Sequence, residues 1–77
     1  MMNIERIARQ FIKSELSRRE LNYSDLEKLL TEAGYPVKRA QIANRLSRGV
    51  YKIDFLIQCM KVLGVKQISL NDLYADD

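Results

Sequence analysis

A run of basic and amide side chains between residues 38 and 49 is the part of the sequence best equipped to bind another molecule. On a helix, at about 100° per residue, Ile42, Ala43 and Leu46 fall on one side and form an apolar stripe. The other side carries cations and amides and no carboxylate: Lys38, Gln41, Asn44, Arg45 and Arg48. Arginine and lysine match phosphates and guanine edges, whereas asparagine and glutamine match adenine edges. The pattern therefore favours a DNA-recognition helix over the alternative of an ordinary solvated amphipathic helix.

The charge of the chain is concentrated around this run. The net charge is +3, yet residues 33–53 contain no Asp or Glu and carry five cations. Subtracting this local +5 from +3 leaves −2 for the rest of the chain. A basic patch on a near-neutral body favours an anionic partner and steers it towards one face.

Catalytic and metal-binding side chains are scarce. The chain has no histidine, which removes the usual general base and leaves no plausible zinc site. The single cysteine, Cys59, cannot form an internal disulfide, and no histidine is present to activate it, so we expect a buried structural residue. Glu15 and Glu20 are expected on polar faces, in weak surface pairs with Arg18 and Arg19. The sequence thus predicts a protein that is not an enzyme and needs no metal or cofactor.

Length and composition indicate one small domain. Seventy-seven residues, 47% of them hydrophobic, suffice for one core and leave no room for a second, so residues 1–77 are expected to form a single domain. The first residues lead into an amphipathic segment instead of the apolar centre of a signal peptide, and no apolar run approaches the length of a membrane span. We expect a cytoplasmic protein without membrane contact. No small-molecule ligand is evident, since a separate effector domain would not fit.

Helical spacing of apolar residues predicts an all-α fold of four to five short helices. The i, i+3, i+4 pattern is clearest in the first segment, where Ile4, Ile7 and Ala8 are followed by Phe11 and Ile12. The expected helices span about residues 3–19, 23–33, 38–48, 54–63 and 69–74.

Local signals mark the ends of these helices. Asn22 and Asp25 have the spacing of a capping box, and Leu21 and Leu26 that of a hydrophobic staple, at the start of the second helix. Asp54 is the expected N-cap of the fourth helix. Glycines stand where three of the helices are expected to stop, at Gly34, Gly49 and Gly64.

The ordered set of motifs resembles the helix-turn-helix core of the lambda-repressor-like, or XRE-type, DNA-binding domains. The resemblance lies in Tyr23-Ser24-Asp25-Leu26 at the start of the second helix, in Gln41–Gly49, and in Phe55–Val65. The phrases IANRLSRG and FLIQCMKVLGV are also similar to a small bacterial family described as a domain of unknown function. Leu26 and Gly34 are eight positions apart, more than in the common pattern, which predicts an extended turn.

The resemblance implies roles for particular residues. In such domains the third helix enters the major groove and the second lies across the backbone. The base-reading candidates carried over to this chain are Arg39, Gln41, Asn44 and Arg45. The phosphate-binding candidates are Ser24, Lys38, Arg48 and Lys52. Arg39 lies nearer the apolar side, so folding back to a phosphate is its alternative, and Ser24 equally fits a residue that only opens a helix.

Two functions are consistent with these residues. The first is sequence-specific binding of double-stranded DNA by a transcriptional repressor or regulator that acts as a homodimer, because two copies on a palindrome double the contacts of one small module. The ends of the first or fourth helix and the segment Leu70–Tyr74 are the candidate dimer interfaces. The alternative is a protein-interaction module, an antitoxin-like or inhibitor subunit, whose basic face grips an acidic protein.

Overall fold

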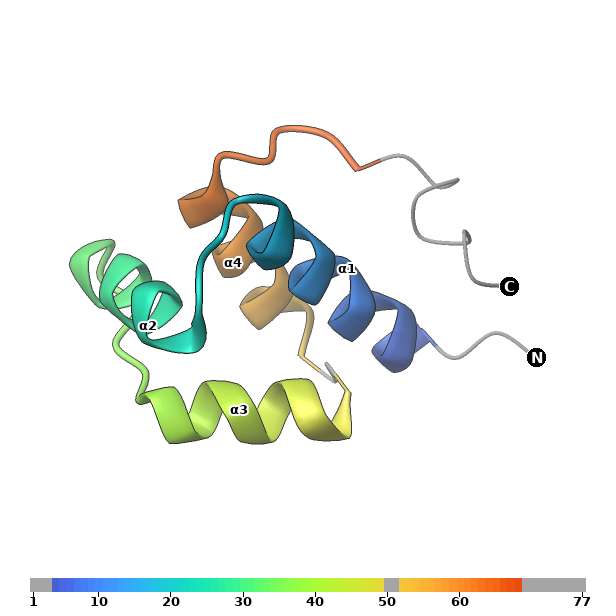
Figure 1. Ribbon diagram of the computed structural model, residues 1–77, viewed down its shortest axis with the longest axis horizontal. Helices are drawn as coiled ribbons and strands as arrows, with labels where there is room; N and C mark the ends of the chain where they lie inside the picture. The colour runs from blue at the N-terminus through green and yellow to red at the C-terminus, as the bar shows by residue number, and fades with distance from the viewer. Residues whose placement is uncertain (1–3, 50–51, 69–77) are drawn as a thin grey trace.

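The computed structural model describes residues 4–49 and 52–68, and this part of the chain is all-α, without a strand (Figure 1). Its elements are α1 (Ile4–Arg18), α2 (Tyr23–Glu32), α3 (Arg39–Arg48) and α4 (Ile53–Leu63). Both α1 and α2 pack against α3 and α4. In Figure 1, α3 runs along the lower edge of the domain, with the other three helices on one side of it. The predicted all-α class is confirmed; the expected segment 69–74 lies outside the described residues.

One apolar core joins the four helices. Its fully buried side chains come from every helix: Ile12, Leu26, Leu30, Ile42, Leu46 and Cys59. These positions follow the helical spacing of the sequence, so the predicted stripes are confirmed in their central parts. At the ends they fail, since Ile4 and Ala33 are exposed. Each lies at a helix terminus: Ile4 is the first residue of α1 and Ala33 is the C-cap of α2.

The start of α2 has the predicted capping box. The Asp25 N–H donates to Asn22 Oδ1 at 2.8 Å, and the Asn22 N–H donates to Asp25 Oδ2 at 2.9 Å. Aspartate is thus long enough to close the box at this position. Two N–H groups that a helix start would otherwise leave without a partner are satisfied, which fixes where α2 begins.

Three helices end with the same hydrogen bond, from an N–H just past the helix to a carbonyl five residues earlier. The pairs are Leu21 to Leu16 at 2.9 Å, Tyr35 to Leu30 at 2.8 Å, and Val65 to Met60 at 2.9 Å. The residue before each donor has a positive φ: Glu20, Gly34 and Gly64. Glycine adopts a positive φ without strain because it has no Cβ. At Glu20 the Cβ makes the same backbone conformation less favourable. The predicted stops at Gly34 and Gly64 are therefore confirmed.

The start of α4 differs from the prediction. Its N-cap is Lys52, and Asp54 lies inside the first turn, where its Oδ1 accepts from the Phe55 N–H at 2.9 Å. The carboxylate still lies at the positive end of the helix, which is the electrostatic reason an acid is favoured there. The N-cap assignment of Asp54 was wrong by two positions.

The connection between α2 and α3, residues 33–38, is the expected extended turn. Two of its side chains tie it to the body of the domain. Val37 is buried, and the Tyr35 hydroxyl accepts from Lys61 Nζ of α4 at 3.0 Å. The Lys61 ammonium also lies 5.6 Å from the centre of the Tyr35 ring. The turn is therefore long but anchored, and it holds α3 at a defined place.

Candidate nucleic-acid interface

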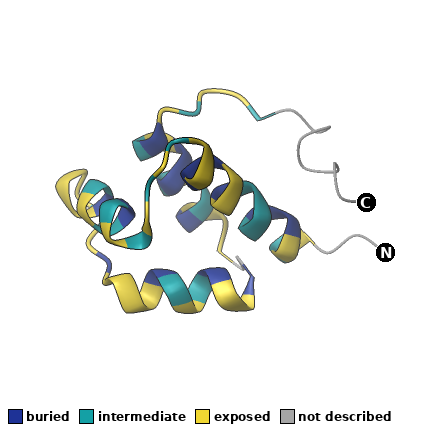
Figure 2. Cartoon of the chain, viewed as in Figure 1, coloured by how far each residue is buried: buried dark blue, intermediate teal, exposed yellow. Residues whose placement is uncertain are grey.

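The two sides of α3 are separated as the sequence predicts. Ile42 and Leu46 are buried against the core and fix the rotation of the helix. The residues that face solvent include most of the predicted contacts: Lys38, Arg39, Gln41, Asn44 and Arg48. Figure 2 shows exposed positions along the outer edge of α3 and buried ones towards the other helices. No acidic residue lies on α3 itself.

Among the base-reading candidates, Asn44 is the most available. It is exposed near the middle of α3, and its amide can donate and accept at one adenine edge. Gln41 is also exposed, but its Oε1 accepts the Lys38 N–H at 2.9 Å. This bond takes up one of the two lone pairs of Gln41 Oε1 and directs the amide towards the start of α3, so Gln41 is less available than Asn44 for a bidentate contact to adenine.

The remaining two base-reading candidates, Arg39 and Arg45, lie beside neighbouring helices. Arg39 is exposed and lines a small hollow with Asn22, Tyr23 and Ser24, at the start of α2. Both roles of Arg39, base reading and a contact to phosphate, stay predictions. Arg45 is half-buried, and its guanidinium carbon lies 4.8 Å from the centre of the Phe55 ring. A cation over an aromatic face is attracted to it, so the side chain is directed towards α4.

The phosphate-binding candidates fall into two groups at opposite ends of α3, and all four are exposed. Ser24 and Lys38 line one groove together with Gln41, between α2 and the start of α3, and the acids Glu27 and Glu32 line the same groove. Arg48 and Lys52 flank the other end, at the last turn of α3 and the start of α4. A ten-residue helix is about 15 Å long, so the two groups are suited to phosphates on either side of a groove.

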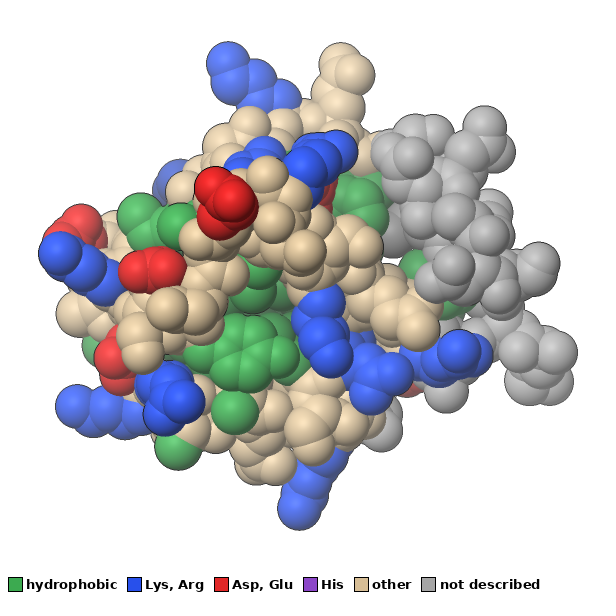
Figure 3. Space-filling view, viewed as in Figure 1, with side chains coloured by type: hydrophobic (Ala, Val, Ile, Leu, Met, Phe, Trp, Pro, Cys, Tyr) green, Lys and Arg blue, Asp and Glu red, His purple; other side chains and the backbone are tan. Residues whose placement is uncertain are grey.

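Arg9 of α1 is a cation at this surface that the sequence reasoning missed. Its Nη1 donates to the carbonyl oxygen of Ser47 at 3.2 Å, which places it beside the C-terminal end of α3. Its Nε is buried without a hydrogen-bond partner. A positive charge here suits the negative end of the helix dipole. Figure 3 shows Lys and Arg side chains gathered over α1 and towards this end of α3.

Glu27 of α2 is the second residue that sequence reasoning missed. Its Oε2 accepts the Arg39 N–H at 2.9 Å, although the two residues are twelve positions apart. Residues 33–53 contain no acid in the sequence, but in the folded protein a carboxylate from α2 lies beside the first turn of α3. The signal was absent from the sequence pattern, since it depends on how α2 and α3 pack.

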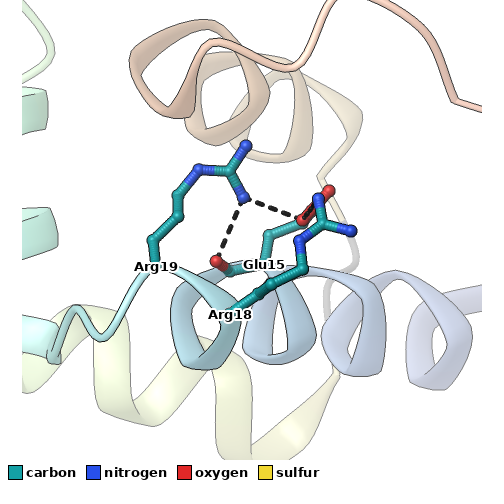
Figure 4. A network of polar contacts seen from close by, with 3 residues as sticks. All are labelled: Glu15, Arg18 and Arg19. Carbon is teal, nitrogen blue, oxygen red and sulfur yellow. Dashed lines mark hydrogen bonds and ion pairs between the residues drawn. The ribbon is translucent and has the colours of Figure 1, made fainter.

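Groups that could support other chemistry are enclosed in the fold. Cys59 is fully buried, and burial raises the pKa of its thiol to about 12, against a smaller lowering effect of Arg45. Glu15 is buried too, where Arg18 and Arg19 both bind its carboxylate (Figure 4), the Arg19 Nη1 at 2.8 Å. The predicted partners are correct, but the predicted surface location is wrong, because Glu15 lies on the side of α1 that packs against α4.

The described residues lack two further features. Within residues 4–49 and 52–68, no group of three or more His, Cys, Asp or Glu side chains could hold a metal ion. None of the helices in this part of the chain is long and apolar enough to cross a membrane.

The fold and the outer side of α3 define a small all-α domain that presents cations and amides on one exposed helix. The chain belongs to the family described as "Domain of unknown function (DUF6471)", whose sequence profile matches residues 4–68. No curated protein and no solved structure matches the chain.

Proposed function

We propose that this protein binds double-stranded DNA sequence-specifically, with α3 as the recognition helix of a lambda-repressor-like helix-turn-helix. The observation that carries the proposal is the exposed side of α3. Asn44 lies near its middle and Gln41 in its first turn. Lys38 and Arg48 lie at its two ends, and the helix has no acid of its own. Recognition in a DNA groove requires side chains that read base edges and cations that hold the flanking phosphates. Amides can do the first and Lys or Arg the second.

The order and packing of the helices support this proposal. α2 precedes α3, and both contribute to one core through Leu26, Leu30 and Ile42. In a helix-turn-helix of this type, the helix before the recognition helix crosses the DNA backbone. Ser24, at the start of α2, lines the same groove as Lys38. The two side chains are therefore placed to contact phosphates on the same side of α3.

We further propose a transcriptional repressor or regulator that acts in the cytoplasm as a homodimer. One α3 reads a single half-site, and two copies related by a two-fold axis read a palindrome. Large apolar side chains are exposed at Ile4 on α1 and at Ile53 and Ile57 on α4. Ile4 and Ile53 lie at helix ends that belong to the predicted interfaces, and Ile57 lies one turn further along α4. The molar mass in solution, measured by light scattering with and without DNA, tests this part of the proposal.

Selection of bound fragments from random duplex DNA tests the central part. We expect an enriched motif with two-fold symmetry, bound with an affinity that falls as salt rises. Three cations per chain at phosphate positions, namely Lys38, Arg48 and Lys52, predict a slope of log affinity against log salt of about −3 per chain and about −5 for a dimer. Absence of any duplex binding at low salt would contradict the proposal and favour an acidic protein as the partner.

A further inference from the structure

The first turn of α3 already holds a negative charge. The Arg39 N–H donates to Glu27 Oε2 at 2.9 Å, and the Lys38 N–H donates to Gln41 Oε1 at 2.9 Å. Lys38 is the N-cap of α3 and has no side-chain oxygen with which to accept from this turn. Two donors at the positive end of the helix are therefore satisfied by side chains, one of which is a full carboxylate reaching across from α2.

A carboxylate at this place changes what the helix start can bind. The N-terminus of a helix attracts phosphate through its free N–H groups and its dipole. Here Lys38 and Arg39 add two cations, so an open helix start would bind any DNA backbone, whatever its sequence. Glu27 takes up one donor and repels an approaching phosphate. Binding then depends more on the middle of α3, where Asn44 lies exposed.

We propose that Glu27 is a specificity-determining residue: its carboxylate weakens the binding of backbone phosphate at the start of α3, beside Lys38, and so lowers non-specific more than specific DNA affinity. The inference rests on the proposed function. It differs from a purely structural role, in which Glu27 would only cap α3 and hold α2 against it. The hydrogen bond serves that structural role, whereas the negative charge serves the proposed one.

Substitutions separate the hydrogen bond from the charge. Glu27→Gln keeps an oxygen that can accept from the Arg39 N–H and removes the charge, whereas Glu27→Ala removes both. Glu32→Gln is the matched control, because Glu32 is an exposed acid on the same helix and lines the same groove, and the change in net charge is identical. The melting temperature of each variant reports the structural contribution.

The experiment titrates each protein against its selected site and against random duplex at several salt concentrations. For Glu27→Gln we expect a melting temperature close to that of the parent and a rise in random-duplex affinity of up to about fivefold, the size of one exposed charge interaction. The rise on the selected site should be smaller, so that the ratio of the two affinities falls. The slope against log salt should steepen by about one unit, as for one added phosphate contact.

Three results would overturn the inference. Equal effects of Glu27→Gln and Glu32→Gln would show that only net charge matters. Unchanged binding by Glu27→Gln would show a structural role alone. A loss of preference at one base pair would make Glu27 a base-reading residue. Each of these requires that the parent binds DNA, whereas a parent that binds no duplex would refute the proposed function itself.

Discussion

Replacing Cys59 tests the packing of α4. This helix also holds Phe55, whose ring contacts the Arg45 guanidinium. The thiol is fully buried in the core, and Phe55, one turn earlier on α4, lies beneath the Arg45 guanidinium. Cys59→Ser keeps nearly the same shape but places a hydroxyl in an apolar site, at a cost of about 1–3 kcal/mol. In a domain of this size each kcal/mol lowers the melting temperature by about 4–8 °C, so we expect a fall of about 5–20 °C.

The same thiol predicts a pH dependence of stability. Burial raises the pKa of Cys59 from 9.0 to about 12 in the fold, with Arg45 acting in the opposite direction. As pH rises above about 9, the unfolded chain loses this proton while the folded chain keeps it, so the unfolded state binds fewer protons and stability falls. At pH 10 the loss should be roughly 1 kcal/mol relative to neutral pH.

Denaturant unfolding of the parent and of Cys59→Ala, at pH 7.5 and pH 10, isolates this contribution. Alanine has no proton to lose, and the other titrating groups are common to both proteins. We therefore expect the stability difference between them to shrink by roughly 1 kcal/mol at the higher pH. An unchanged difference, or labelling of the native thiol as fast as that of the unfolded chain, would refute the buried position of Cys59.

Further predictions concern helix ends. Asn22→Ala breaks the capping box with Asp25 and should lower stability by about 1 kcal/mol without changing DNA sequence preference; relaxed preference at an unchanged melting temperature would instead make Asn22 a contact residue. Gly49→Ala should cost on the order of 1–3 kcal/mol, because φ is +100°, ψ is 159° and the new Cβ would lie 3.1 Å from Glu5 Cβ. Gly64→Ala, with open space around it, should cost less in the same thermal unfolding experiment, and a reversed order would contradict the contact between Gly49 and α1.

Much of the fold was predictable, because the relevant signals are local. Apolar residues at helical spacing identified the buried sides of all four helices, and the Asn22–Asp25 box gave the first residue of α2 correctly. Helix ends without such a box were less certain. The start of α4 was misplaced because Asp54 has the side chain of an N-cap but acts from within the first turn.

The long-range features were not predictable, because they depend on packing between helices distant in sequence. Glu27 meets the start of α3 only because α2 packs against α3. Arg9 reaches Ser47 only because α1 packs on α3. Glu15 looks like a polar-face residue in the sequence, and only the covering helix α4 makes it buried.

The candidate site shows the same division. The sequence pattern placed Gln41, Asn44 and Arg48 on the side of α3 that the structure leaves exposed. It gave no sign that Gln41 Oε1 would be engaged by the Lys38 N–H, or that Arg45 would turn towards Phe55. Both departures arise from contacts that form only when the helix start and the core are in place.

The most direct test of the central claim compares Asn44→Ala with Arg48→Ala on the selected DNA site and on random duplex. If α3 reads DNA, Asn44→Ala should cost about 1–3 kcal/mol on the selected site and much less on random duplex, and relax one position of the motif. Arg48→Ala should weaken both duplexes similarly and reduce the steepness of the salt dependence by about one unit. If both variants bind both duplexes as the parent does, α3 does not face DNA and the claim is wrong.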